Sequence, residues 1–148
     1  MVSYYTARPS RDIIAAARQE LTRDSWKRIN SDFDCYISVL VVPEAGSGDK
    51  IAASKRLEAL SGIPVLDLDF EVERVANFLI ADGVIPKKYP EDALHIASAA
   101  QNGMDYLVTW NFTHIHNAQM ENSIRRTIEK YGYQCPVFCS PPELIGDR

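Results

Sequence analysis

The apolar residues of the chain follow helical and strand-like patterns in turn. Near the start they recur about every 3.6 positions, which predicts a helix capped by Ser10 and ending before Asp32. The inward stripe of this helix would be formed by Ile14, Ala17, Leu21 and Ile29. Residues 35–42, CYISVLVV, are apolar and rich in β-branched side chains without polar alternation. This pattern predicts a strand covered on both faces in a parallel sheet.

The middle of the chain repeats this alternation. Asp49 can cap a helix that Gly62 closes, and its apolar positions are Ile51, Ala52, Leu57 and Leu60. A short strand is expected over residues 64–68. A further helix is expected over residues 70–81, stopping at Gly83.

The last third continues in the same way, with a helix over residues 91–101 and a strand over residues 105–109. A later helix ends at Gly132, and its apolar positions are Met120, Ile124, Ile128 and Tyr131. Val137-Phe138 predicts a last short strand. The run Ser140-Pro141-Pro142-Glu143 matches a capping box with proline at the first helical position.

Strands that alternate with helices predict an α/β domain with a mainly parallel sheet. The 148 residues fit one domain with a core of its own, so we expect a single domain over residues 1–148. In such sheets ligands gather beyond the carboxyl ends of the strands. Polar residues at those ends are therefore the first candidates for a site.

Composition and charge narrow the possible functions. The chain is 46% hydrophobic and 24% charged, and no apolar run approaches the roughly 20 residues of a membrane helix. The first residues show no secretory signal, so we expect a cytoplasmic location and no membrane partner. The net charge of −4 argues against binding nucleic acid mainly through a bulk positive field, but local basic patches remain possible.

Three cysteines, Cys35, Cys135 and Cys139, suggest reduced thiols rather than a disulfide framework. Cys135 and Cys139 could bind zinc only with other residues, and His114 and His116 precede them. If residues 136–138 are a strand, the two sulfurs lie about 13 Å apart, at about 3.3 Å per residue. One ion cannot bind both, so zinc is disfavoured.

Three oxygen-bearing side chains fit the expected edge of the sheet. Glu44 follows the strand predicted over residues 35–42, Asn111 follows the strand predicted over residues 105–109, and Asp92 opens an apolar helix. Taken singly, Asp92 and Glu44 can be helix caps. Taken together, the carboxylates would repel unless a cation lay between them, and this donor set suits Mg²⁺ or Mn²⁺. Such an ion serves water attack on a phosphodiester.

Basic residues near this set could bind a phosphate backbone. Lys87 and Lys88 precede Asp92, and Arg125-Arg126 lies on a later helix. The alternative is an ordinary solvated surface for either pair. His95, one turn after Asp92, could orient it, although a lone histidine on an apolar helix is more often a packed, hydrogen-bonded residue.

Four segments together resemble PIN-domain proteins of the VapC-like toxin group. They are SVLVVPEAGSGD, IPVLDLD, DGVIPKKYPEDALHIASAAQNGMDYLVTWNFTHIHNA and GYQCPVFCSPPEL, and the resemblance spans residues 4–144. It implies a three-layer α/β/α nuclease with a mainly parallel sheet, typically a ribonuclease that holds Mg²⁺ or Mn²⁺ with three or four acidic residues. It also implies RNA as substrate, an antitoxin protein as partner and a homodimer.

The resemblance assigns the metal and catalytic roles to three positions. Glu44 resembles the second acid of the family, Asp92 the third, and Asn111 the fourth, which is aspartate in many members. The family's first acid lies on an opening strand, and Met1-Val2-Ser3 resembles only the tail of that strand.

Two hypotheses follow from this assignment. One is a metal-dependent endoribonuclease of the toxin–antitoxin kind. The other is a catalytically inactive PIN-like module that binds protein or RNA. A small-molecule phosphohydrolase is a weaker third interpretation, since the chain has no G-x-x-x-x-G-K-[ST] phosphate loop.

Overall fold

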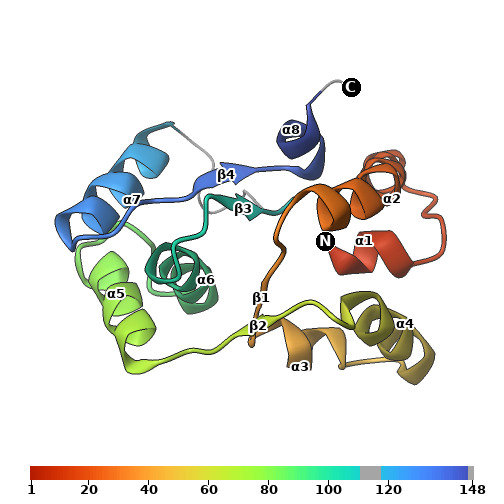
Figure 1. The fold of residues 1–148 in the computed structure, drawn as a ribbon, viewed down its shortest axis with the longest axis horizontal. Helices are drawn as coiled ribbons and strands as arrows, with labels where there is room; N and C mark the ends of the chain where they lie inside the picture. Colours follow the sequence, from red (N-terminus) through yellow and green to blue (C-terminus); the bar gives the residue numbers. More distant parts are fainter. Residues whose placement is uncertain (111–117, 147–148) are drawn as a thin grey trace. The chain divides into compact units, whose positions relative to one another are not determined.

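The computed structural model describes residues 1–110 and 118–146. Over these residues the chain is mixed α/β and mostly helical, with two small parallel two-stranded sheets (Figure 1). It divides into two compact units. Unit 1 comprises Met1–Val65 and Cys139–Arg148, and unit 2 comprises Leu66–Phe138. The expected mixture of helices and parallel strands is confirmed, whereas the three-layer PIN-like arrangement and the single domain stay predictions.

Unit 1 is built mainly of helices. They are α1 (Val2–Thr6), α2 (Ile13–Asp32), α3 (Val41–Ala45), α4 (Lys50–Leu60) and α8 (Pro141–Ile145). Its sheet pairs β1 (Ile37–Ser38) with β2 (Val65–Leu66), which lies where unit 1 meets unit 2 in the sequence. Among the described residues, no helix of either unit has the length and apolar character needed to cross a membrane.

Two predictions for the first part of the chain are wrong. The strand expected over residues 35–42 is reduced to Ile37–Ser38, and Val41–Ala45 forms α3. Pro43 lies in the first turn of α3, where the backbone N–H that proline lacks would have no partner within the helix, so a helix accommodates it better than a strand does. Met1-Val2-Ser3 does not continue a strand either, because Val2–Thr6 is a helix.

The helix expected after Ser10 begins later. Asp12 is the N-cap of α2, and its Oδ1 accepts a hydrogen bond from Ala15 N over 2.8 Å. Ser10 Oγ instead accepts from Asp12 N over 3.1 Å, so it supports the capping residue. The helix then runs through Asp32, the residue before which it was expected to end.

The stripe predicted to face inward on α2 is confirmed at Ile29, which is buried, and is wrong at its other three positions. Ile14 is 66% and Leu21 is 42% exposed. The side chains that α2 buries are Gln19, Thr22, Ser25 and Ile29. Thr22 and Ser25 can be buried because their hydroxyls donate to the carbonyls of Arg18 and Leu21, both over 2.6 Å.

The side chain of Gln19 is buried and forms hydrogen bonds with the backbone of the loop that precedes α2. Its Nε2 donates to Arg8 O over 2.8 Å, and its Oε1 accepts from Ser10 N over 2.7 Å. Arg23 Nη2 donates to Ala7 O over 2.5 Å, one turn further along the helix. Tertiary hydrogen bonds therefore decide which side of α2 is covered.

The structure of unit 2 agrees more closely with the sequence pattern. Its elements are α5 (Phe70–Ala81), α6 (Pro90–Gln101), β3 (Tyr106–Val108), α7 (Ala118–Lys130) and β4 (Val137–Cys139), whose last residue belongs to unit 1. β3 pairs with β4. The helix expected over residues 70–81 is confirmed. The helix expected over residues 91–101 starts one residue earlier, and the strand expected over residues 105–109 loses a residue at each end.

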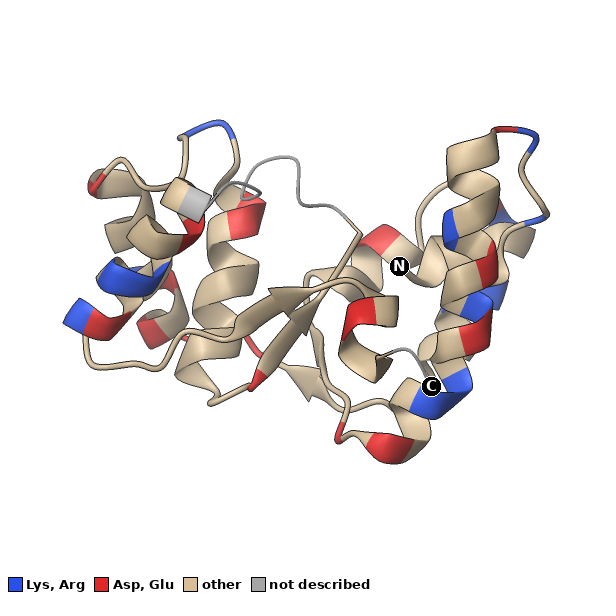
Figure 2. Cartoon of the chain, turned by 90° about the horizontal axis from the view of Figure 1, so that it is seen from above, with Lys and Arg blue, Asp and Glu red and all other residues tan. Residues whose placement is uncertain are grey.

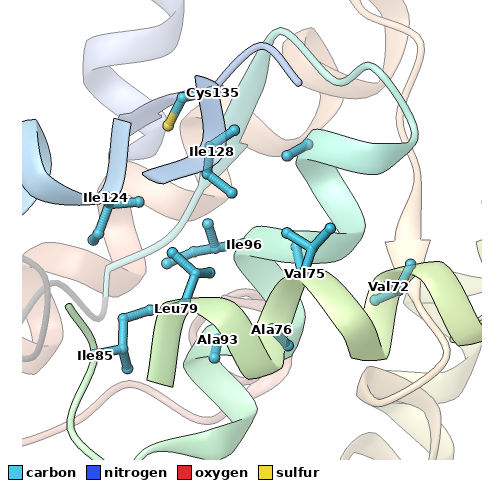
Figure 3. Close-up of a cluster of buried hydrophobic side chains, with 12 residues drawn as sticks. Val72, Val75, Ala76, Leu79, Ile85, Ala93, Ile96, Ile124, Ile128 and Cys135 are labelled. Carbon is cyan, nitrogen blue, oxygen red and sulfur yellow. The ribbon is translucent and has the colours of Figure 1, made fainter. Parts of the chain in front are cut away.

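The core of unit 2 lies between its three helices. Leu79 of α5 and Ile96 of α6 point toward one another, and Ile124 and Ile128 of α7 cover them (Figure 3). Leu79, Ile124 and Ile128 are fully buried, and Ile96 is nearly so. Burying each of these side chains contributes about 1.5–3 kcal/mol to the stability of the fold. The apolar sides of the three helices therefore stabilise unit 2.

An aromatic stack joins α5 to the segment after α7. The rings of Phe78 and Tyr131 lie 3.8 Å apart, centroid to centroid, with an interplanar angle of 5°. The Arg74 guanidinium lies 5.3 Å from the Phe78 centroid, and Lys130 Nζ lies 5.1 Å from that of Tyr131. The stack is thus flanked by a cation at each end.

Candidate functional site

Asp92 lies in the first turn of α6. Tyr89 is the N-cap, Pro90 is the first helical residue, and Glu91 and Asp92 are both acidic residues of that turn. Asp92 is half-buried, Glu91 is exposed, and Ala93 beside them is fully buried. A carboxylate here is stabilised by the positive end of the helix dipole. The start of α6 therefore holds one partly desolvated carboxylate next to one solvated carboxylate.

His95 lies one turn after Asp92 and is half-buried. Burial lowers the pKa of His95 below its ordinary value of 6.5, while the negative charges of Asp92 and Glu91 partly oppose this shift. The imidazole is therefore neutral at pH 7. It lies within the electrostatic field of Asp92, as an orienting residue would need to.

The basic pair next to this turn is accessible. Lys87 and Lys88 are exposed in the segment between α5 and α6. Lys88 Nζ lies 5.2 Å from the ring centroid of Tyr89, the N-cap residue of α6. On α7, Arg126 is exposed and Arg125 is half-buried. Lys87 and Lys88 thus precede Asp92 by five and four positions in unit 2, and both are exposed to solvent.

Glu44 has a different environment from the one predicted. It is exposed and belongs to α3 rather than following a strand. The α-amino group of Met1 interacts electrostatically with the Glu44 carboxylate. Burial lowers the pKa of that amine below its ordinary value of 8.0, and Glu44 opposes the shift. The sequence pattern gave no sign of this neighbour, because the two groups are 43 positions apart along the chain.

The three predicted ligands are not assembled within either unit. Glu44 belongs to unit 1 and Asp92 to unit 2, while Asn111 lies outside the described residues. Within residues 1–110 and 118–146, no group of three or more His, Cys, Asp or Glu side chains is placed to hold a metal ion. The shared metal site remains a prediction.

Cys135 and Cys139 are buried, and Cys35 is half-buried. Burial raises the pKa of Cys135 and of Cys139 to about 11, and it also raises the pKa of Cys35. His114 and His116 lie outside the described residues.

The residues around the start of α6 include groups whose chemistry suits a phosphate and a divalent cation. Lys87 and Lys88 supply positive charge, Asp92 supplies an oxygen donor that suits a hard divalent cation, and neutral His95 can exchange a hydrogen bond. Comparison of the chain with protein-family models, with curated proteins and with solved structures gave no match. The family assignment therefore remains the resemblance described above.

Proposed function

We propose that the chain is an endoribonuclease of the toxin–antitoxin kind that depends on Mg²⁺ or Mn²⁺. Asp92, Glu44 and Asn111 would hold the ion, and Lys87 and Lys88 would bind the RNA backbone. The observation that carries the proposal is the half-buried carboxylate of Asp92 in the first turn of an otherwise apolar helix. The resemblance of residues 4–144 to PIN-domain toxins supports the same function, with an antitoxin protein as the natural partner.

The donor chemistry of these residues fits such an ion, since two carboxylates and one amide oxygen are hard ligands. When bound, the ion would lower the pKa of a water molecule and neutralise charge on the phosphoryl oxygens. Asp92 would orient that water, and neutral His95 would orient Asp92. The lysines would hold the phosphodiester in place and add to the positive potential around it.

The test is cleavage of a labelled RNA of mixed sequence, with Mn²⁺ and with EDTA. Cleavage is expected with Mn²⁺ and not with EDTA. Asp92→Asn should lower the rate at least about 100-fold, as expected for the loss of a direct metal ligand. Glu91→Gln is the matched control, because it removes the same charge from the same helical turn at an exposed side chain. Cleavage that persists in EDTA and in Asp92→Asn would rule out the proposal.

A second candidate is a PIN-like module that binds RNA or protein without cleaving it. The observation that favours it is the environment of Glu44. This residue is exposed on a five-residue helix near the buried amine of Met1, and it does not follow a strand as the predicted metal ligand would. This function predicts RNA binding in EDTA that weakens in the Lys87→Ala/Lys88→Ala variant. The Lys50→Ala/Lys55→Ala variant is the control, since it removes two exposed lysines from α4. Fluorescence anisotropy with labelled RNA measures both.

A further inference from the structure

Helix α6 ends in an asparagine that is followed by a glycine. Asn102 is the C-cap residue, with φ −89° and ψ 5°, and Gly103 follows it with φ +71°. Both residues are exposed. Gly103 N donates to Ala100 O over 3.2 Å. The next N–H, that of Met104, donates to Ala99 O over 2.9 Å, so the helix closes in a Schellman motif with glycine at the left-handed position. An exposed side-chain amide therefore directly precedes a backbone nitrogen that no Cβ shields.

This arrangement favours a covalent reaction between the two residues. Gly103 N attacks the side-chain Cγ of Asn102, and the new N–C bond replaces the bond from Cγ to Nδ2. The amide nitrogen leaves as ammonia together with the proton of Gly103 N, and a succinimide ring remains. Water then opens the ring at either carbonyl carbon, which gives aspartate or isoaspartate. The space for the ring is open, since a Cβ placed on Gly103 would meet no described atom within 4 Å.

Two hydrogen bonds oppose the reaction while the turn is closed. Asn102 Nδ2 donates to Ser98 O over 2.8 Å, and Gly103 N is bound to Ala100 O. Both bonds must open before the nitrogen can attack Cγ. Each net hydrogen bond changes an equilibrium about fivefold, so together they slow the reaction about 25-fold relative to an open turn. Because the last turn of a helix opens readily, the reaction is slowed but not prevented.

Asn30 of α2 makes the same side-chain contact but is followed by a different residue. It is exposed, lies in the last turn of its helix and donates from Nδ2 to Trp26 O, four positions back, over 2.8 Å. Ser31 follows it and still belongs to α2, so the backbone N–H of Ser31 is bound within the helix. The Ser31 side chain also shields that nitrogen. Asn30 is therefore an internal control for Asn102.

We propose that Asn102 is a site of spontaneous deamidation in the folded chain, and that the C-terminal turn of α6 sets the rate. Residues 93–104 contain no Lys, Arg, Asp or Glu, so α6 is uncharged beyond its acidic first turn (Figure 2). The product places a carboxylate at the negative end of the helix dipole and removes the donor to Ser98 O. The modified turn therefore closes less well than the original one, at the far end of the helix that starts near Asp92.

Incubation of the full chain in mildly alkaline buffer, followed by peptide mapping with mass spectrometry, tests this proposal. The alkaline buffer favours loss of the Gly103 amide proton, and the mapping measures the fraction of each asparagine that has become an acid. In the folded chain the acid is expected at Asn102 and not at Asn30. In urea that unfolds the chain, the rate at Asn102 should rise about 25-fold, because both hydrogen bonds are absent. Asn102→Gln should remove the product, since its longer side chain closes the corresponding ring far more slowly.

The comparison of the two asparagines decides the outcome. A folded chain in which Asn102 keeps its amide as long as Asn30 does would overturn the proposal. An equal rate at Asn102 with and without urea would overturn the control of the rate by the end of α6. Asn102→Asp measures the consequence directly, and its urea midpoint should lie below that of the wild type. An unchanged midpoint would refute the effect on the turn. The reaction uses only water, so its result does not depend on the proposed RNA cleavage.

Discussion

The α2 helix of unit 1 and the α5 and α6 helices of unit 2 bury different kinds of side chain. In unit 2, α5 and α6 bury aliphatic side chains such as Leu79 and Ile96. In unit 1, α2 buries Gln19 and Thr22 and exposes Ile14. Periodicity shows which residues share a side of a helix. The neighbouring elements and their hydrogen bonds decide which side is covered, and in α2 they override the apolar pattern.

The comparison is tested most strongly by making the same substitution in both units. Leu79→Ala should lower the free energy of unfolding by about 2–5 kcal/mol, because Leu79 is fully buried and alanine leaves a cavity. Leu21→Ala, at a residue that is 42% exposed, should change it by about 0.5 kcal/mol or less. Urea denaturation measures both. Equal losses would mean that α2 buries Leu21 after all.

Helix capping should act alike in the two units, with a smaller effect. Asp49 accepts a hydrogen bond from Ala52 N over 2.9 Å in unit 1, and Asp69 accepts from Val72 N over 2.8 Å in unit 2. Asp49→Ala and Asp69→Ala should each cost about 1 kcal/mol of unfolding free energy, because a backbone N–H loses its partner. Asparagine caps about as well as aspartate, so the matching Asp→Asn variants should keep most of the stability. If the urea midpoints of the Asp→Asn variants fell as far as those of the Asp→Ala variants, the lost stability would not come from helix capping.

Features that depend on a few adjacent residues could be predicted from the sequence. Asp49 caps α4 as expected, and Ser140 N donates to Glu143 Oε1 over 3.0 Å as the capping box requires. Gly83 follows α5 with φ +71°, a conformation that glycine adopts without strain. Each of these depends on contacts within about four positions, which the sequence displays directly.

Features that depend on distant partners could not be predicted from the sequence. Residues 35–42 have strand-like composition, yet only Ile37–Ser38 pair with β2, and the chain is helical from Val41 onward. The same limit applies to the candidate site. The helix that starts with Asp92 was expected from local pattern, whereas the neighbour of Glu44, the amine of Met1, was not. A site shared by Glu44 and Asp92 would join distant parts of the chain, which the local pattern cannot predict. The RNA cleavage experiment is the test of such a site.

The smallest expected effect concerns an acid-sensitive contact of unit 2. Glu71 binds Arg74 through two hydrogen bonds of 2.6 and 2.9 Å, and Tyr133 Oη donates to it over 2.5 Å. Chiefly through Arg74, and then Tyr133, these bonds lower the pKa of Glu71 from 4.5 to about 2. Because the folded pKa is the lower one, the stabilisation is present above about pH 4.5 and is lost as the pH falls toward 2.

Replacing Glu71 should therefore lower the free energy of unfolding by an amount that depends on pH. Urea midpoints of wild type and Glu71→Gln should differ at pH 7 and converge as the pH falls from about 4.5 toward 2. The difference should be small because Arg74 is 45% exposed and water screens the pair. Tyr133→Phe should reproduce a smaller part of the same change, since its hydroxyl is the lesser contributor. If the difference between wild type and Glu71→Gln stayed constant with pH, the link between α5 and Tyr133 would be stabilised by packing alone, and the Phe78–Tyr131 stack would account for it.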